Sequence, residues 1–355
     1  MIFIKKYLII IIFFFSFILN AKALSASGVV AMDLSTNRVL YEQNMNSKRL
    51  IASITKIMTC IVAIENADIE KEVTVGKEVL KSFGSGIYIE VGEKINFKDL
   101  LYGLMLRSGN DAAIEIAYNT AGDMPSFVKL MNEKAQEIGM KNTNFINAHG
   151  LEDETGNGNI STAYDMALLT SYAYKNDIFK EIFGTKKKIA KSNTKTYSWT
   201  NKNKILHSYD FITGGKTGYT KKAKRTLVTT AEKDNKKIVI VTLNDGNDFS
   251  DHINLYQKLF SEYDSIQILN KNSFSLDECT DCYIKNDFYA MVNKKEKDNI
   301  EIENVLEKNS NSDYAGVIRI KLKDKLLHEE MIYKNKQEYK KESFFQKLRD
   351  WILSW

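Results

Sequence analysis

The chain has 355 residues, 44% of them hydrophobic and 27% charged, which is enough for one large buried core and a smaller one. Its 50 Lys and Arg residues exceed its 45 Asp and Glu residues by five. Removal of the three lysines in residues 1–23 leaves 47 basic against 45 acidic residues, and this near balance excludes a nucleic-acid-binding protein.

Residues 1–23 have the pattern of an export signal. Lys5 and Lys6 give a basic start, residues 7–19 are apolar, and Ala-Lys-Ala at 21–23 offers small residues for cleavage. The apolar run is short for a membrane span, and an uncleaved anchor is the alternative interpretation. Either interpretation predicts that the rest of the protein is exported.

The first elements predicted after this signal are a hairpin and a helix. Two apolar runs at 28–34 and 38–43, separated by three polar residues, predict the hairpin. The helix runs to residue 66 and starts near Ser53, which shares one face with Lys56. A serine hydroxyl becomes a nucleophile when a base takes its proton, and a neutral lysine can be that base. Burial and a nearby cation both lower a lysine pKa toward this state.

Two further helices are predicted to meet at a short polar sequence. Residues 97–106 and 111–119 have helical patterns, and Ser108-Gly109-Asn110 lies between them. The glycine is expected to break the first helix, which leaves the Ser108 and Asn110 side chains on a turn. Next along the chain, Asp123 is expected to cap a helix that ends at Gly139.

The catalytic region is predicted to end with strands and a helix. Residues 211–220, which contain Lys216-Thr217-Gly218, are predicted to form an extended edge segment where glycine allows a substrate backbone to approach. Strands at 226–231 and 237–243 and a helix at 249–263 follow. Because strands lie at both ends with helices between them, we predict an α+β domain with an antiparallel sheet over residues 24–264.

A small β domain is predicted over residues 265–337, where short alternating runs suggest no chemistry. Cys279 and Cys282 lie within it, and a disulfide fits an exported protein. A redox Cys-x-x-Cys or a metal site are the alternatives, although the surrounding pattern favours neither. Cys60, on the apolar helix after Lys56, is predicted to fill the core.

Residues 340–355 are predicted to form an amphipathic helix. Its apolar face carries Phe344, Phe345, Leu348, Trp351, Ile352 and Trp355. A terminal helix of this kind, rich in tryptophan and basic residues, is typical of attachment to a membrane surface. Packing against a protein core is the alternative interpretation.

Three motifs occur in a specific order in this chain. Ser53-x-x-Lys56 precedes Ser108-Gly109-Asn110, and Lys216-Thr217-Gly218 follows both. The first spacing recurs at Ser126 and Ser192, so the combination is what carries the signal. This ordered set is found in penicillin-binding proteins and serine β-lactamases.

With these motifs, residues 27–260 resemble the low-molecular-mass penicillin-binding proteins, which are serine D-alanyl-D-alanine carboxypeptidases. The likeness includes residues 101–113 and Asn-Ala-His-Gly-Leu at 147–151. It implies the penicillin-binding and β-lactamase-like fold for the catalytic domain. His149, inside the second stretch, is interpreted as a structural loop residue.

The resemblance implies an acyl-enzyme mechanism on a peptidoglycan stem pentapeptide. Ser53 attacks the carbonyl of the penultimate D-Ala, and Lys56 accepts the serine proton. Ser108 relays a proton to the leaving amine, and Asn110 holds the substrate amide. Water then frees the tetrapeptide, and no metal or cofactor is required. β-Lactam antibiotics are the expected covalent inhibitors.

The resemblance also assigns roles to the third motif. Lys216 and Thr217 grip the terminal carboxylate, and Lys216 supplies the cation that lowers the pKa of Lys56. Gly218 lets the substrate approach, and the backbone N–H groups of Ser53 and Tyr219 form the oxyanion hole.

One departure concerns the carboxylate. In many relatives an arginine binds the terminal carboxylate of the substrate, and this arginine comes from the segment after the strands that follow Lys-Thr-Gly. In this chain no arginine lies between Arg225 and Arg319. Either Lys216 and Thr217 bind the carboxylate alone, or Arg225 turns inward. The comparable region holds Asp251 and His252.

The order of export signal, catalytic domain, β domain and terminal helix also resembles the usual domain order of that family. It implies an exported protein attached peripherally to the outer face of the cytoplasmic membrane and acting in cell-wall synthesis. The form of the Lys216 region resembles sporulation-associated members of Gram-positive bacteria.

Two rival functions remain. A serine β-lactamase shares the motif order but needs rapid deacylation, usually by a glutamate-held water. The glycine in Ser108-Gly109-Asn110 and the extra β domain favour the carboxypeptidase. A non-catalytic wall-binding module is the second rival, and it predicts that Ser53→Ala leaves the cellular phenotype intact.

Overall fold

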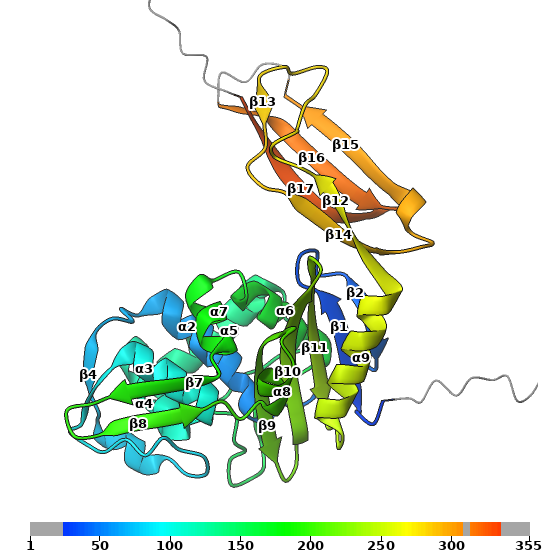
Figure 1. Ribbon diagram of the computed structural model, residues 1–355. Coiled ribbons are helices and arrows are strands. Elements are labelled where there is room, and N and C mark those ends of the chain that lie inside the picture. Colours follow the sequence, from blue (N-terminus) through cyan, green and yellow to red (C-terminus); the bar gives the residue numbers. More distant parts are fainter. Residues whose placement is uncertain (1–23, 308–312, 335–355) are drawn as a thin grey trace, which may run out of the picture. The chain divides into compact units, whose positions relative to one another are not determined.

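The computed structural model describes residues 24–307 and 313–334, which form two compact units (Figure 1). The first unit comprises residues 24–34, 39–233 and 237–259, and the second comprises residues 35–38, 234–236 and those from 260 onward. The predicted export signal (1–23) and terminal helix (340–355) lie outside the described residues. Of the helices within these limits, none has the length and apolarity needed to cross a membrane.

A five-stranded sheet forms the centre of the first unit, and its strand order is β2-β1-β11-β10-β9. The strands are β1 (Gly28–Asp33), β2 (Val39–Gln43), β9 (Ile212–Thr220), β10 (Lys224–Lys233) and β11 (Lys236–Leu243). The pairs β1–β2, β1–β11 and β9–β10 are antiparallel. Strand β9 lies at one edge, so the sheet, the predicted hairpin and the predicted edge segment are confirmed.

Helices, short turns and three small strand pairs make up the rest of the first unit (Figure 1). They are α2 (Lys56–Asn66), α3 (Phe97–Tyr102), α4 (Asn110–Ala121), α5 (Met124–Ile138), α6 (Ala163–Ala173), α7 (Asp177–Gly184), α8 (Lys204–Ser208) and α9 (Asp248–Glu262). Shorter turns are the 3₁₀ segments η1 (Ala52–Thr55) and η2 (Lys77–Lys81) and the π-helical η3 (Gly103–Arg107). Small strand pairs are β3–β6 (Arg49–Leu50, Ile160–Ser161), β4–β5 (Glu72–Thr74, Lys94–Asn96) and β7–β8 (Lys187–Lys191, Thr196–Thr200).

Helix α2 runs through the main hydrophobic core. Its residues from Lys56 to Ala63 are all buried, because apolar side chains surround it on every side and α4, α5 and α6 pack around it. Strands β9 and β10 pack against η1, and the Thr226 hydroxyl donates to the Ile51 carbonyl at 3.0 Å. The sheet edge and the start of α2 are therefore held together.

Local capping sets the ends of α5 as the sequence predicts. The Asp123 carboxylate accepts the Ser126 N–H at 2.7 Å, and Pro125 occupies the first turn, where its missing N–H costs nothing. Gly139 ends the helix with a φ of +88°, a conformation that glycine adopts without steric cost.

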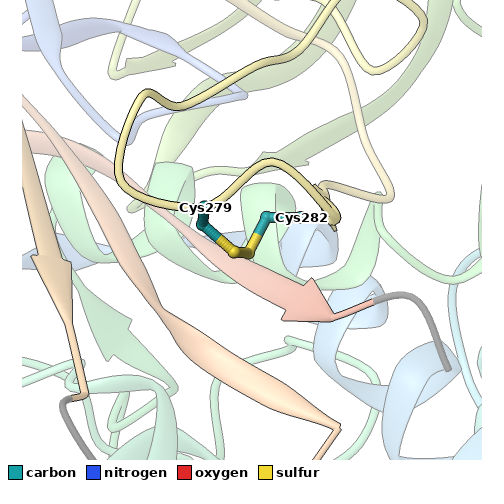
Figure 2. The surroundings of a disulfide bond; sticks show 2 residues. All are labelled: Cys279 and Cys282. Carbon is teal, nitrogen blue, oxygen red and sulfur yellow. A yellow bond between two sulfur atoms is a disulfide. The ribbon is translucent and has the colours of Figure 1, made fainter. Parts of the chain in front are cut away.

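The second unit is a small β structure with its own apolar core. Its strands are β12 (Tyr263–Leu269), β13 (Cys282–Tyr283), β14 (Phe288–Asn293), β15 (Ile300–Leu306), β16 (Tyr314–Leu322) and β17 (Lys325–Lys334), with a short 3₁₀ turn η4 (Lys297–Asn299). Strands β13-β17-β16-β15 form one sheet, and β12 pairs with β14. Figure 2 shows the disulfide that joins Cys279 and Cys282, as the sequence predicts, whereas Cys60 is a free thiol buried in the first unit.

Candidate active site

Ser53 and Lys56 lie side by side where η1 leads into α2. The Lys56 Nζ is 3.1 Å from the Ser53 Oγ, so the predicted contact between the first motif's two side chains is present. The 3₁₀ turn brings residues three apart onto one side, and α2 then carries the lysine into the core. Lys56 has no exposed surface, which is unusual for a lysine.

Three oxygen atoms surround the Lys56 amine. Besides the Ser53 Oγ, the Asn110 Oδ1 lies at 2.7 Å and the His149 carbonyl oxygen at 2.6 Å. Burial lowers the pKa of Lys56 well below its usual value, and the positive charges of Lys216 and Lys202 lower it further. The lysine is therefore held in conditions that favour its neutral form.

The turn that presents Ser108 differs from the one that the sequence predicts. Ser108, not Gly109, takes the left-handed conformation, with a φ of +62°, whereas Gly109 has a φ of −60°. Gly109 is needed for space, because an added Cβ would lie 2.9 Å from an Asp111 oxygen and 3.2 Å from Ile87. The first helix ends in the π-helical η3, a feature common at functional sites. Strain of about 1–3 kcal/mol is typical of a non-glycine residue in this conformation.

Asn110 starts α4 and anchors the loop that follows η2. Its Nδ2 donates to the Phe83 carbonyl at 2.6 Å, and its backbone N–H donates to the Ser85 carbonyl at 2.7 Å. The neighbouring Asp111 carboxylate accepts the N–H groups of residues 87–89. The loop is therefore fixed against the turn that carries Ser108.

Lys216 enters the site from the edge strand β9. It is 2% exposed, and its Nζ donates to the Thr217 carbonyl at 2.7 Å. Burial, followed by the charge of Lys202, lowers the pKa of Lys216 to about 7. Gly218 is required on the same strand, because an added Cβ would lie 2.9 Å from the Ser53 backbone nitrogen and 2.4 Å from Thr226.

These residues meet at one cleft of about 500 Å³. The predicted site residues that line it are Ser53, Ser108, Thr217, Gly218 and Tyr219. Lys56 and Asn110 lie directly behind Ser53 through the contacts given above, and Lys216 precedes Thr217 on the strand. The structure therefore brings the three motifs together from η1, the η3–α4 turn and β9.

Arg225, the residue of the second alternative for the carboxylate, also lines this cleft. Its guanidinium binds the Asp248 carboxylate through two nitrogens, at 3.0 and 2.5 Å, and lies over the Phe249 ring. His252, in contrast, is fully buried between threonines of β10 and β11, at 2.7 and 3.1 Å, and Asp251 accepts hydrogen bonds from Ser25.

Sequence reasoning missed several residues at the cleft. Lys202, Ser85, Asp248 and Phe249 contribute to its lining, and no motif marks them. The Lys202 Nζ donates to the Ser85 hydroxyl at 3.1 Å. A lysine in so lysine-rich a chain gives no signal of its own. Within residues 24–307 and 313–334, no group of three His, Cys, Asp or Glu side chains is arranged to hold a metal ion.

Comparisons with known proteins agree on a single family. Residues 16–247 match the family model described as D-alanyl-D-alanine carboxypeptidase. The carboxypeptidase DacF of Bacillus subtilis is 34% identical over 256 residues, which are 70% of this chain and 65% of that protein. DacC of Escherichia coli is 34% identical over 236 residues, 63% of this chain and 58% of that protein. The chain thus matches less than two thirds of the length of either relative.

Solved structures agree as well. A D-alanyl-D-alanine carboxypeptidase from Mycobacterium tuberculosis has a TM-score of 0.64 at 26% identity, over 67% of this chain and 92% of that one. Penicillin-binding protein 5 of Haemophilus influenzae has a TM-score of 0.71 over 88% of this chain and 97% of that one. At 23% identity this second likeness shows the fold, including that of the β domain.

Proposed function

This chain belongs to the D-alanyl-D-alanine carboxypeptidase family, and we propose that it removes the terminal D-Ala from peptidoglycan stem pentapeptides through an acyl-enzyme on Ser53. The observation that carries the proposal is the buried amine of Lys56, 3.1 Å from the Ser53 hydroxyl and surrounded by only two further oxygens.

A neutral amine can satisfy all three oxygens around the Lys56 Nζ. A neutral amine has two hydrogens and one lone pair, whereas an ammonium has three hydrogens and no acceptor. The Asn110 amide oxygen and the His149 carbonyl can only accept, and they use the two hydrogens. Of the three neighbours only the Ser53 hydroxyl can also donate, so a neutral Lys56 can present its lone pair to the serine proton across this 3.1 Å contact. This arrangement supports Lys56 as the general base.

The reaction then follows in two halves. Lys56 takes the Ser53 proton as Oγ bonds to the carbonyl carbon of the penultimate D-Ala, and the backbone N–H groups of Ser53 and Tyr219 receive the oxyanion. The C–N bond breaks, and Ser108 passes a proton from Lys56 to the leaving amine of D-Ala. Water then attacks the ester and returns the hydroxyl to Ser53.

The terminal carboxylate would bind to the cationic groups of the cleft. Lys202, Arg225 and Thr217 line the cleft, and the buried Lys216 precedes Thr217 on the strand. Arg225 is held by Asp248, so its orientation is set before a substrate arrives. These groups favour an anionic chain end, which is the defining feature of a carboxypeptidase substrate.

Incubation of the purified protein with a stem pentapeptide tests this function. We expect one equivalent of free D-Ala per peptide, a stable covalent adduct with fluorescent penicillin, and loss of both in Ser53→Ala. Rapid hydrolysis of the penicillin without D-Ala release would identify a β-lactamase instead. Neither reaction in the wild-type protein, or labelling that persists in Ser53→Ala, would contradict the proposal.

We also propose that the protein acts outside the cell, on the outer face of the cytoplasmic membrane, and, from the form of the Lys216 region alone, that it is expressed during sporulation. The pattern of residues 1–23, the aromatic terminal segment and the Cys279–Cys282 disulfide support export and attachment. Deletion of residues 344–355 should move the protein from membrane to soluble fractions with its activity intact. An unchanged partition would contradict attachment by this segment, and a reporter silent during sporulation would contradict the timing.

A further inference from the structure

We propose that Glu152 positions the oxyanion hole by holding the end of strand β9, next to the Tyr219 N–H group. This inference rests on the proposed function and adds a positioning residue to the same reaction. The Glu152 carboxylate accepts a hydrogen bond from the Thr220 hydroxyl, and Thr220 is the last residue of β9. Glu152 therefore contacts the residue that follows one of the two N–H donors, and it acts on the reaction only through that residue.

The end of β9 lies beside Ser53 and carries an exposed side chain. The strand is at the edge of the sheet, and an added Cβ at Gly218 would lie 2.9 Å from the Ser53 backbone nitrogen. Tyr219 comes next in the chain and is 62% exposed, so its ring does little to fix the backbone that carries it. A small displacement of this strand end would therefore change the distance between the two N–H groups of the oxyanion hole.

The loop that carries Glu152 is fixed against η1. Gly150 has a φ of +89°, and an added Cβ would lie 2.0 Å from the Ala52 carbonyl oxygen, so the two backbones are in close contact. The Asn147 side chain accepts from the Gly150 N–H at 2.7 Å and donates to the Leu151 carbonyl at 2.9 Å. Glu152 follows directly, so its carboxylate is attached to a backbone whose place beside the nucleophile is already set.

The Thr220 hydroxyl both donates and accepts. It donates to Glu152 and accepts the Ala223 N–H at 3.0 Å, across the turn that joins β9 to β10. A hydroxyl has a single hydrogen, so a carboxylate on one side orients its lone pairs toward the N–H on the other. Glu152 thus holds the strand end and the turn after it in one arrangement. Without this acceptor the hydroxyl is free to rotate, and the turn loses a contact with the loop.

Two neighbouring residues allow this contact to be told apart from a general effect of charge on the loop. Glu154 is an exposed carboxylate two residues further along. Lys222, which is also exposed, joins the turn to the loop through a longer hydrogen bond, 3.4 Å from its Nζ to the Gly156 carbonyl oxygen. Glu152 and Thr220 are half-buried, so their contact is better shielded from water and should contribute more.

An oxyanion hole stabilises the transition state rather than the bound substrate. The negative oxygen forms only as Ser53 bonds to the carbonyl carbon, so a misplaced Tyr219 N–H should lower kcat and leave KM nearly unchanged. The Lys56 amine is bonded to groups outside the Glu152–Thr220 contact. The pH at which kcat/KM rises, which reports deprotonation of Lys56, should therefore not shift.

The rate of D-Ala release from a stem pentapeptide, per active site counted with fluorescent penicillin, tests this role. We expect Glu152→Ala to lower kcat by about 10- to 50-fold, less than the loss of about 10²- to 10³-fold that is typical when an oxyanion donor is removed outright. Glu152→Gln should keep most of the rate, because an amide oxygen can still accept from the Thr220 hydroxyl. Glu154→Ala is the matched control and Lys222→Met removes the exposed contact, and both should keep kcat within about twofold of the wild type.

Thr220→Val tests the same contact from the other side without removing a charge. It should lower kcat at least as much as Glu152→Ala, and the double variant should be no slower than Thr220→Val alone, because both changes break one contact. A peptide ending in D-boroalanine forms a tetrahedral adduct with Ser53 that carries an oxygen at the oxyanion position. Its affinity should fall in both single variants by the same factor as kcat.

The outcomes separate this inference from the proposed function. An unchanged kcat in Glu152→Ala would overturn the positioning role, and so would an equal fall in Glu154→Ala. A fall in kcat without a matching loss of affinity for the boronic acid, or with a shift of the pH at which kcat/KM rises, would also overturn it. A wild-type protein that releases no D-Ala would instead contradict the proposed function.

Discussion

The two units of this protein bury charge in different ways. The first buries two lysines, Lys56 and Lys216, close enough for the charge of one to lower the pKa of the other. In the second, the described buried charges are Lys236, whose Nζ donates to two backbone carbonyls at 2.9 and 3.2 Å, and Glu330, which accepts from Asn286 and His328. The second unit therefore pairs its buried charges, whereas the first, besides paired carboxylates such as Asp111 and Asp248, brings the two amines of Lys56 and Lys216 near each other.

This difference in buried charge indicates that the reaction takes place in the first unit. Burying like charges costs free energy that folding must offset elsewhere, and a large apolar core such as the one around α2 can offset it. Proteins accept such arrangements at sites where a lowered pKa is needed for a reaction. We therefore expect substitutions in the first unit to change catalysis and matched substitutions in the second to change stability alone.

The largest effect is expected from Lys56→Arg. Arginine keeps its proton at any accessible pH, so it cannot accept the one from Ser53. We expect the rate of acylation by fluorescent penicillin to fall by about 10³-fold or more, near the upper range for loss of a general base. Lys129→Arg is the control, since Ser126 and Lys129 repeat the same spacing on α5 with Lys129 largely exposed. A rate within tenfold of the wild type in Lys56→Arg would contradict the assignment.

A smaller effect is expected from Arg225→Gln. Loss of a charged hydrogen bond to the substrate carboxylate should raise KM for the pentapeptide by about 10- to 100-fold with a lesser change in kcat. Asp248→Asn should raise KM less, because the guanidinium remains but loses its anchor. The control is Arg319→Gln, which breaks the comparable exposed pair with Glu329 in the second unit. An unchanged KM in Arg225→Gln would leave Lys216 and Thr217 as the carboxylate site.

The pH profile should reveal Lys216. Its pKa of about 7 means that it is cationic below this pH and neutral above it, and only the cation attracts the carboxylate. We expect kcat/KM for the pentapeptide to fall by about tenfold per pH unit above 7, while the lower limb reports deprotonation of Lys56. In Lys216→Gln the fall in kcat/KM above pH 7 should disappear, and most of the affinity for the pentapeptide should be lost. A wild-type profile that stays flat to pH 9 would exclude this role for Lys216.

The smallest effect on function is expected from Cys279→Ser. The disulfide closes a loop across a sequence separation of only 3, so its loss should cost the second unit about 2 kcal/mol of unfolding free energy. Thermal unfolding should show a lower unfolding temperature for the second unit and an unchanged one for the first. The rate of D-Ala release should not change. A loss of D-Ala release in this variant would contradict the separation of roles between the units.

The sequence predicted the elements whose residues have a clear period or cap. The edge strand around Lys216, the capped helix between Asp123 and Gly139, and the antiparallel sheet all follow from local patterns. The hairpin β7–β8 was not predicted, because Ile189 of β7 is exposed between lysines and Ala190 is the single buried residue of that strand. Its stability comes from Tyr197 and Trp199 packing on the core, which local sequence does not reveal.

The residues of the candidate site that belong to a sequence motif were predicted, and those outside the motifs were not. Ser53, Lys56 and Lys216 have recognisable neighbours in sequence, but the acceptors of the Lys56 amine include a backbone carbonyl, which has no sequence signature. Lys202 and Asp248 reach the cleft through tertiary structure alone. The left-handed conformation at Ser108 also escaped prediction, because glycine next to it offered the simpler turn.

Activation of Ser53 depends on the charge state of Lys56 at neutral pH, which can be measured. Its ε-carbon signal can be followed by NMR in protein labelled at lysine and assigned by comparison with Lys56→Arg. We expect Lys56 to be uncharged at pH 7, because burial and the charge of Lys216 lower its pKa well below the usual value. An ammonium that persists at Lys56 through pH 9 would contradict its role as the base that activates Ser53.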